Sequence, residues 1–334
     1  MSNHSKILNF IQDNYSLAGD LKDLPSYIDK NYLLTTTCGD KFVVKISSQT
    51  TPVEEVELEN AAMQHIHNKQ MSFQTPFVLK NKYNQELLDF NDTDSNTYKF
   101  RIISYLEGDL YSQVDINNSD LHDSLGKLIA EITHAFSDFV NPAAKRDLLW
   151  DLVNLTRLNP LLKYFESDKK YTLQRILQDI LASALPKLKP LPQQVIHNDA
   201  NNTNLIASEL NGKLSCVGLF DFGDMVYTHR ICELAIGMAY ALMGQENILK
   251  TASSIVDGYQ SVNTLLEEEI LILPELIKAR LLQSIIISGK SHAQNPNNEY
   301  LLISVTPAWE LLHKLDTLKP NQFVNYISWE LVRE

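Results

Sequence analysis

The chain has 334 residues, a length that at about 150 residues per domain suggests two domains or one domain of two lobes. Apolar residues make up 44% and charged residues 21%, the composition of an ordinary globular protein with a sizeable core. Aspartate and glutamate total 41 against 29 lysines and arginines, so the formal net charge is −12. This charge argues against a general nucleic-acid binder and against binding to an anionic membrane surface. It is compatible with a cationic small molecule but does not select one.

The cysteines and the apolar runs indicate the compartment. Three cysteines without metal-ligand spacing disfavour a disulfide framework and fit a reducing cytosol. The N-terminus lacks the basic region and the long apolar run of a signal peptide. The longest apolar stretch, residues 234–243, is too short to cross a bilayer. We therefore expect a cytoplasmic protein with no membrane partner, and the sequence leaves its oligomeric state open.

The first third of the chain predicts strands and one helix. Two β-rich runs, residues 32–37 and 42–46, flank a polar turn and predict a hairpin. Pro52 then opens a predicted helix that continues to about residue 68. Further strands are predicted near residues 77–80, 85–90 and 98–105.

Glu107 and Gly108 mark a break, after which helical patterns dominate. Short strands are expected at residues 195–196 and 205–221. Strand runs followed by helix runs predict an α+β fold, with a β-rich N-terminal lobe at 1–108 and a mainly helical C-terminal lobe at 109–334. The helical patterns cover residues 119–137, 147–165, 170–185, 229–243, 246–265 and 268–289.

The most informative segment is residues 195–206, in which a polar loop separates two apolar strands. The loop has the spacing H-x-D-x-x-x-x-N, in which Asp199 and Asn204 are the last two motif positions. An Asn-Gly pair in the hairpin that follows predicts a tight turn, which sets Asn204 beside about residue 219. Asp221, the first residue of a D-F-G-D segment, comes two residues later. The sequence therefore predicts that Asn204 and Asp221 share one site, with Asp199 at its mouth.

These residue types in this order suit phosphoryl transfer. The transferred group carries dispersed negative charge, which Mg²⁺ neutralises. Because Mg²⁺ prefers oxygen ligands, Asp221 would supply a carboxylate and Asn204 an amide oxygen, while Asp199 would accept the proton of the attacking hydroxyl. The protein-kinase template has the same order of aspartate base, asparagine five residues later and D-F-G. The alternative is a polar surface loop followed by an unrelated hairpin.

The first lobe should then hold a nucleotide. Lys45 ends a predicted strand, like the phosphate-contacting lysine of kinases, and that lysine needs a carboxylate to position it. Glu57 and Glu59 are the candidates on the following helix. We favour Glu59, because it shares one helical face with Ala62 and Met63, whereas Glu57 lies on a more polar face. In isolation, Lys45 would be interpreted as a solvated lysine at a strand end.

These motifs give the chain a family resemblance. The chain resembles the aminoglycoside-phosphotransferase and choline-kinase superfamily of protein-kinase-like small-molecule kinases, and within it the hydroxylysine-kinase-like group. The resemblance spans nearly the whole chain. It is carried by DKNYLLTT at 29–36, FVVKI at 42–46, PAAKRDLLWD at 142–151, IHND at 196–199, FDFGDMV at 220–226, LAI at 234–236, NEYLLI at 298–303 and PAWELL at 307–312.

The resemblance implies a bilobal protein-kinase-like fold that uses ATP or GTP as co-substrate and Mg²⁺ as cofactor. The N-terminal lobe would bind nucleotide, with Lys45 and Glu59 as the phosphate-positioning pair. The C-terminal lobe would bind the acceptor and hold Asp199 as catalytic base, with Asn204 and Asp221 as metal ligands.

The resemblance adds further expectations in the N-terminal lobe. A loop around Asp29 and Asn31 would cover the phosphates, and the backbone of Ser104 and Leu106 would contact the purine. The chain also departs from the family, since Asn198 stands where the family usually has glycine. Asparagine tolerates the left-handed backbone conformation better than most residues.

The acceptor site is less constrained. Trp150, Asp151 and Trp309 are candidates to line it, because an aromatic face with a carboxylate suits a cationic amine. Helix packing is an equally good interpretation of these three residues. Asp224 is a candidate for a second ion or a substrate ammonium, and loop capping is the alternative.

The expected function is transfer of the γ-phosphate of ATP or GTP to the hydroxyl of a small amino alcohol or hydroxy amino acid such as hydroxylysine. Homoserine, and an aminoglycoside or choline-like acceptor, are the alternatives. A protein kinase is less favoured, because no A-P-E segment follows D-F-G-D. A nucleotide-binding pseudokinase is the non-enzyme alternative, disfavoured by retention of the lysine, the base and both metal ligands.

Overall fold

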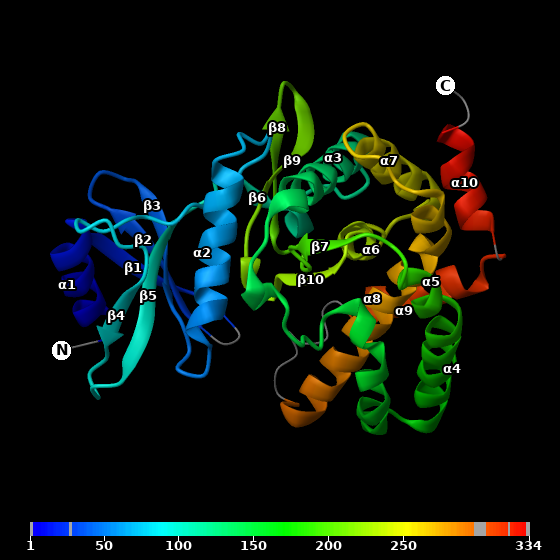
Figure 1. Ribbon diagram of the computed structural model, residues 1–334, viewed down its shortest axis with the longest axis horizontal. Coiled ribbons are helices and arrows are strands. Elements are labelled where there is room, and N and C mark those ends of the chain that lie inside the picture. Colours follow the sequence, from blue (N-terminus) through cyan, green and yellow to red (C-terminus); the bar gives the residue numbers. More distant parts are fainter. Residues whose placement is uncertain (1–2, 27–28, 297–304, 320, 332–334) are drawn as a thin grey trace. The chain divides into compact units, whose positions relative to one another are not determined.

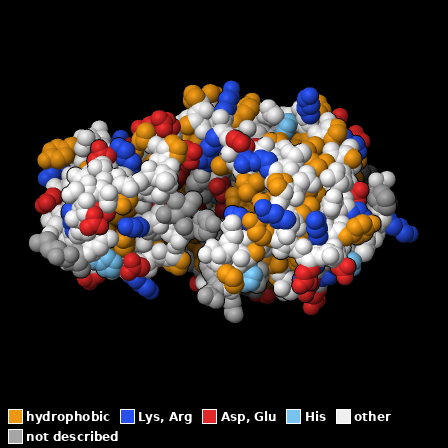
Figure 2. All heavy atoms as spheres, turned by 90° about the horizontal axis from the view of Figure 1, so that it is seen from below, with side chains coloured by type: hydrophobic (Ala, Val, Ile, Leu, Met, Phe, Trp, Pro, Cys, Tyr) orange, Lys and Arg blue, Asp and Glu red, His pale blue; other side chains and the backbone are white. Residues whose placement is uncertain are grey.

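The structure is a computed structural model that describes residues 3–26, 29–296, 305–319 and 321–331. The chain divides into two compact units, the first unit being Met1–Glu107 with Asn141–Ala144 and the second unit Gly108–Val140 with Lys145–Glu334. Strands dominate the first unit and helices the second (Figure 1), so the expected α+β class is confirmed. No helix among the described residues is long and apolar enough to span a membrane. On the face shown in Figure 2, lysine and arginine side chains are scattered among acidic ones.

A five-stranded antiparallel sheet is the centre of the first unit. Its strands pair in the order β1-β2-β3-β5-β4. The predicted hairpin is β2 and β3. The elements of this unit are α1 (Asn3–Tyr15), β1 (Gly19–Leu24), β2 (Lys30–Thr36), β3 (Lys41–Ile46), α2 (Val53–His67), β4 (Leu88–Asn91), β5 (Thr97–Ser104) and the 3-10 turn η3 (Pro142–Ala144), which packs against α2.

Alternation along β3 and β5 sorts side chains between the two faces of this sheet. Successive strand residues point to opposite faces, so every second residue joins the same layer. Lys45 and Arg101 lie at the positions between apolar residues, and Glu59 of α2 contacts both of them. The alternate apolar positions instead pack with the apolar face of α1, in a core that includes Ile7, Ile11, Tyr15, Val44, Ile46, Phe100 and Ile102.

The second unit is mainly helical and contains two small antiparallel sheets. Helix α6 is buried on nearly all sides and forms part of the unit's core. The strands are β6 (Asp109–Leu110), β8 (Leu205–Leu210) and β9 (Lys213–Leu219) in one sheet, and β7 (Gln193–Ile196) and β10 (Val226–His229) in the other. The helices are η1 (Tyr111–Gln113), α3 (Ser119–Ala135), η2 (Phe136–Asp138), η4 (Leu152–Tyr164), α4 (Ser167–Ser183), α5 (Leu185–Leu188), η5 (Phe222–Asp224), α6 (Ile231–Ala241), α7 (Ile248–Gln260), α8 (Glu267–Gln294), α9 (Val305–Thr317) and α10 (Gln322–Leu331).

Several elements differ from the predicted ones. The helix predicted at 147–165 is the 3-10 segment η4, which contains Pro160. Proline lacks the amide hydrogen that an α-helical ladder requires inside a helix. The strand predicted at 77–80 is a single bridge, between Val78 and Ile103. Strand β1 is absent from the predicted elements, because it is an edge strand whose residues are mostly polar and give no apolar alternation.

Helices α3 and α7 approach each other closely at two glycines. A Cβ atom on Gly126 would lie 2.0 Å from the backbone oxygen of Ile255. A Cβ atom on Gly258 would lie 2.1 Å from the backbone oxygen of Asp123. Because these neighbours are backbone atoms, no side-chain rotation makes room for a methyl group. Helix α3 also packs against β9, so the glycine contact helps to hold the helix that supports the β8–β9 hairpin.

We expect Gly126→Ala to lower the free energy of unfolding by about 1–3 kcal/mol, because the added methyl group forces α3 and α7 apart. Urea denaturation measures this change. Lys127→Ala is the matched control on the same helix: it removes only an exposed ion pair with Asp123 and should cost about 0.5 kcal/mol or less. Equal unfolding midpoints for the two variants would contradict the close contact.

Candidate active site

The loop at residues 197–204 and the hairpin after it bring the predicted motif residues together. Asn211 and Gly212 have φ angles of 53° and 77° and form the tight turn between β8 and β9. The N–H of Phe220 donates to the carbonyl of Asn204 at 3.0 Å. This partner is one residue beyond the predicted one, because a bulge shifts the register of the hairpin. Asp221 follows directly.

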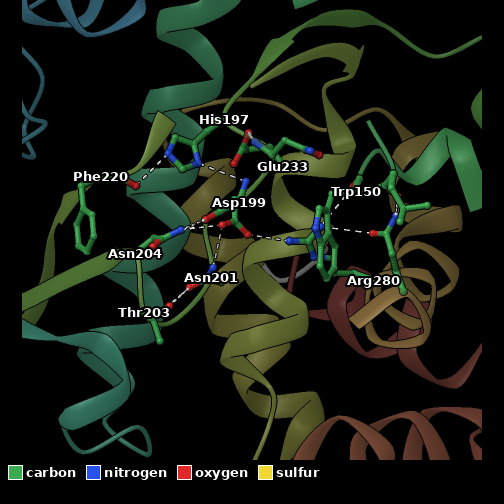
Figure 3. Close-up of polar contacts among 12 residues, drawn as sticks. Trp150, His197, Asp199, Asn201, Thr203, Asn204, Phe220, Glu233 and Arg280 are labelled. Carbon is green, nitrogen blue, oxygen red and sulfur yellow. Dashed lines mark hydrogen bonds and ion pairs between the residues drawn. The ribbon is translucent and has the colours of Figure 1, made fainter. Parts of the chain in front are cut away.

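The carboxylate of Asp199 is held at both oxygens (Figure 3). Its Oδ2 accepts hydrogen bonds from the side-chain amides of Asn204 at 2.8 Å and Asn201 at 3.0 Å. Its Oδ1 accepts from Nη2 of Arg280, on α8, at 2.8 Å. The Asp199 side chain is 18% exposed. The carboxylate is therefore oriented by three donors and still reaches solvent.

Neighbouring residues anchor this loop to the elements around it. His197 lies with Nε2 3.1 Å from the carbonyl oxygen of Phe220, and its Nδ1 accepts from the N–H of Asp199 at 3.3 Å. The N–H of Asn198 donates to Glu233 of α6 at 3.1 Å. Asn198 has a φ of 67°, which is the left-handed conformation expected where the family has glycine. Its side-chain amide is fully buried and has no hydrogen-bond partner among the described residues.

Two carboxyl groups at the loop have raised pKa values. Burial raises the pKa of Asp199 to about 7, and the nearby charges of Asp224 and Asp221 act in the same direction, while Arg280 opposes the rise. Burial also raises the pKa of Glu233 to about 7, against hydrogen bonds from the loop backbone. Perturbed carboxyls of this kind cluster at functional sites. A group that titrates near neutral pH is suited to proton transfer.

The segment after β9 presents a carboxylate in a strained conformation. Asp221 has a φ of 64°, a left-handed backbone that a residue with a side chain adopts only at some cost. Arg146 holds the turn that follows by donating to the carbonyl of Met225 at 2.9 Å and to that of Gly223. A side chain from a distant part of the sequence therefore holds the turn that follows Asp221.

Asn204 and Asp221 fit a magnesium ion by their donor chemistry. The amide nitrogen of Asn204 donates to Asp199 twice, at 2.8 and 3.0 Å, which leaves its Oδ1 as the atom to face a cation. Mg²⁺ usually takes one or two carboxylates, and water and substrate phosphates complete its coordination. Such a site needs no dense cluster of protein ligands. Within the described ranges, no group of three or more His, Cys, Asp or Glu side chains could hold a metal.

In the first unit, Lys45 and Glu59 form the expected pair. Nζ of Lys45 lies 3.8 Å from Oε2 of Glu59, and the two side chains are only 10% and 11% exposed. Glu57, the rejected candidate, is exposed to solvent. Arg101 is completely buried and also pairs with Glu59, and it donates to the side chain of Asn60. Glu59 therefore balances two cations that the sheet directs toward α2.

The expected phosphate-covering loop is described only in part, since residues 27–28 lie outside the described ranges. Asp29 accepts a hydrogen bond from the N–H of Ser48 at 3.1 Å. Asn31 lies on β2 opposite Lys45, and its side-chain oxygen is buried with no partner among the described residues. Asn31 and Lys45 thus lie opposite each other on neighbouring strands of the sheet.

The expected purine-contact segment borders a cavity of about 340 Å³ in the first unit. Ser104 and Leu106 line it together with the end of α2 and residues 70–77. The N–H of Ser104 already donates to the carbonyl of Phe77 at 2.9 Å. That N–H is therefore engaged within the unit and is not available to a purine.

The four acceptor candidates have different surroundings. Trp150 packs its ring against the guanidinium of Arg280, which lies 4.6 Å from the ring centroid. Asp151 is 4% exposed and accepts hydrogen bonds from the first turn of η4 and from a hydroxyl of β10. Trp309 is half-buried on α9. Asp224 ends η5 and lies close enough to Asp199 to raise its pKa.

Sequence reasoning missed the residues that hold the candidate groups in place, namely Asn201, Arg101, Arg146 and Arg280. Arg280 and Arg101 each interrupt an apolar run, a pattern that indicates a buried charge with a partner. The pattern does not identify the partner, because Arg280 and Asp199 are separated by 81 residues. Asn201 lies inside the motif loop, at one of its unspecified positions.

Comparisons with known proteins identify the family of the chain. A family model described as "Phosphotransferase enzyme family" matches residues 20–261, and the chain belongs to this family. The chain is 26% identical over 329 residues to the hydroxylysine kinase of Danio rerio, covering 92% of each chain. It is 27% identical over 321 residues to the hydroxylysine kinase of Xenopus laevis, covering 89% of this chain and 84% of the relative.

A solved structure shares the fold. The microcompartment-associated aminopropanol kinase has a TM-score of 0.72 and 16% sequence identity, covering 98% of this chain and 99% of its own. The family match confirms the expected superfamily, and this structure confirms the expected protein-kinase-like fold. As a member of its family, the protein is a phosphotransferase that acts on a hydroxyl group.

We expect Asn198→Gly to be more stable than Asn198→Ala by about 1–2 kcal/mol, because only glycine adopts the left-handed backbone here without a Cβ penalty. Both variants remove the same buried amide, so the difference between them isolates the backbone conformation. Thermal unfolding followed by calorimetry measures it. Equal stabilities would mean that residue 198 does not require a positive φ.

Proposed function

We propose that the protein transfers the γ-phosphate of ATP or GTP to the hydroxyl of a small amine or hydroxy amino acid, and that a hydroxylysine-like molecule is its acceptor. The observation that carries this proposal is the contact between Asp199 and Asn204, beside Asp221, in a chain similar to hydroxylysine kinases over most of its length. An aspartate base with two oxygen donors for Mg²⁺ is the set of groups that phosphoryl transfer needs.

Asp199 is the proposed base. An acceptor hydroxyl that reaches the exposed edge of this carboxylate donates its hydrogen bond there. As the hydroxyl oxygen attacks the γ-phosphorus, the bond from that phosphorus to the β–γ bridging oxygen breaks and the nucleoside diphosphate leaves, while the hydroxyl proton passes to the carboxylate. Donors already fix both oxygens of Asp199, so little reorientation is needed at the moment of reaction.

Asn204 and Asp221 are the proposed ligands of Mg²⁺. When bound, the ion would neutralise negative charge on the phosphates. Lys45 is proposed to contact the phosphates, because its pairing with Glu59 keeps the ammonium group at one position on β3.

Asp29 and the start of β2 at Asn31 are proposed to cover the phosphates, since Asn31 lies beside Lys45 in the sheet. The backbone near Ser104 and Leu106 is proposed to contact the purine. The engaged N–H of Ser104 makes Leu106 the stronger candidate as a donor. A turnover assay with each nucleotide distinguishes ATP from GTP as the phosphate donor.

The acceptor is proposed to carry an amine beside its hydroxyl. The names of the similar proteins, hydroxylysine kinase and aminopropanol kinase, share this chemistry. Asp224 is the proposed partner of the ammonium group, because its charge already acts on Asp199. Arg280 covers one face of Trp150, so only the other face could receive a substrate cation. Asp151 and Trp309 are proposed as wall residues of this site.

The test of this function is a turnover assay with ATP or GTP, Mg²⁺ and a panel of acceptors. The panel contains hydroxylysine, homoserine, aminopropanol, choline and kanamycin, and the measured quantity is acceptor-dependent release of nucleoside diphosphate. Hydroxylysine should give the highest kcat/KM. Mg²⁺-dependent nucleotide binding without turnover on any acceptor would favour the pseudokinase instead.

We expect Asp199→Ala to reduce kcat by about 10²–10⁴-fold, because the variant has no group to take the proton. Its nucleotide affinity should remain near wild type, as Asp199 is not a proposed nucleotide contact. Asp179→Ala is a matched control, since it removes an exposed aspartate of α4 that pairs with Arg175. Full activity of the Asp199 variant would exclude its role as base.

We expect Asp221→Ala to abolish the Mg²⁺ dependence of nucleotide binding, because it removes the proposed carboxylate ligand. Isothermal titration of nucleotide into the protein at increasing Mg²⁺ concentration measures this dependence. The Asp179→Ala variant should keep the wild-type curve. An Mg²⁺ titration that is the same for Asp221→Ala and wild type would count against the metal role.

A further inference from the structure

Arg280 is a buried cation in the middle of α8. It is 1% exposed, and its guanidinium lies between two aromatic rings, 4.6 Å from the centroid of Trp150 and 5.5 Å from that of Tyr240. Its Nη1 donates to the carbonyl of Trp150 at 3.3 Å and contacts the side chain of Gln283 at 3.4 Å. Its Nη2 donates to Asp199 at 2.8 Å. The guanidinium is therefore fixed in place before any ligand arrives.

Burying the guanidinium costs desolvation free energy, and an ion pair with an anion is needed to offset this cost. Asp199 forms an ion pair with Arg280 at 2.8 Å, and the charge of Asp224 acts on the same guanidinium. An apolar side chain of similar volume would fill the same space without the desolvation cost. The arginine also leaves its Nε buried without a hydrogen-bond partner among the residues that the structure describes. The arginine therefore keeps its ion pair with Asp199 although one of its own buried N–H groups has no hydrogen-bond partner among the described residues.

The donors on the two oxygens of Asp199 come from different parts of the fold. Asn201 and Asn204 bind Oδ2 and belong to the same loop as Asp199, so they move together with it. Arg280 binds Oδ1 from α8 (Figure 3). The two donors on Oδ2 belong to the loop, so they do not prevent the carboxylate from moving together with the loop. The donor on Oδ1 belongs to a packed helix and therefore fixes the plane of the carboxylate relative to α8.

We propose that Arg280 is a positioning residue, which acts through Asp199 by fixing the orientation of its carboxylate toward the acceptor hydroxyl. This inference rests on the proposed role of Asp199 as base. Arg280 does not itself contact the substrate, because its guanidinium is enclosed between the two rings and the carboxylate. Its effect belongs to the chemical step and not to binding of either substrate.

The first test compares Arg280→Met and Arg280→Lys with wild type. Arg280→Met should lower kcat by about 100-fold, the cost typical of a misplaced reacting group, with little change in either KM. Arg280→Lys keeps the charge but loses the planar fork, so it should lose about 10-fold. If the methionine variant does not fold, the lysine variant decides. A wild-type kcat in a folded variant, or a loss confined to KM, overturns the proposal.

Arg230→Met is the matched control, because Arg230 forms another largely buried ion pair of the second unit. It donates to Glu269, near the start of α8, through two hydrogen bonds of 2.8 Å. This variant should lose thermal stability and keep a kcat within about two-fold of wild type. An equal loss of kcat in the Arg230 and Arg280 variants would mean a general loss of structure and would overturn the positioning role.

A double variant separates this inference from the function on which it rests. If Arg280 acts through Asp199, Asp199→Asn with Arg280→Met should be no slower than Asp199→Asn alone in single-turnover assays. A further 100-fold loss in the double variant would show that Arg280 acts elsewhere. If Asp199→Asn itself retains wild-type activity, the proposed base is wrong, whatever the Arg280 variants do.

Discussion

The candidate site in the second unit depends on hydrogen-bond donors to both oxygens of one partly buried carboxylate, that of Asp199. A carboxylate removed from water is stable only when hydrogen bonds and an opposite charge replace its hydration. Asp199 obtains these from its own loop and from α8, and each source depends on a different packing contact. The β7–β10 pair and His197 fix the loop, while the rings beside Arg280 fix the charge. One metal-binding candidate belongs to the same loop, because Asn204 orients its amide by donating to Asp199.

In the first unit, two partly or fully buried cations share one carboxylate. There one carboxylate, Glu59, lies between two cations that the alternation of β3 and β5 directs to the same face. Lys45 is therefore only one of two partners of Glu59, and Arg101 is the more deeply buried one. Arg101 anchors Glu59 to the sheet, which lets Lys45 pair with a carboxylate that is already in position. Family resemblance points to Lys45 and Glu59, and the geometry adds the arginine that supports them.

The sequence predicted the parts of this molecule whose signals are local. The hairpin of β2 and β3, the Asn-Gly turn after β8 and the left-handed Asn198 each depend on a few neighbouring residues. The choice of Glu59 over Glu57 followed from helical periodicity. Contacts between distant segments could not be predicted, since nothing near Asp199 in the sequence indicates a partner 81 residues away. The 3-10 segment η4 also differed from its predicted helix, because an apolar period does not distinguish the two when a proline interrupts it.

The membership of η3 in the first unit has a consequence for how the chain can be divided experimentally. The sequence up to Glu107 contains the whole sheet and α2, yet Pro142–Ala144, which packs against α2, comes from beyond the next helix. A fragment that stops at the break near Gly108 would expose the part of α2 that η3 covers. Expression of the N-terminal fragment alone thus leaves part of α2 uncovered. Fragment complementation or a permuted chain would have to keep residues 141–144 with the N-terminal half.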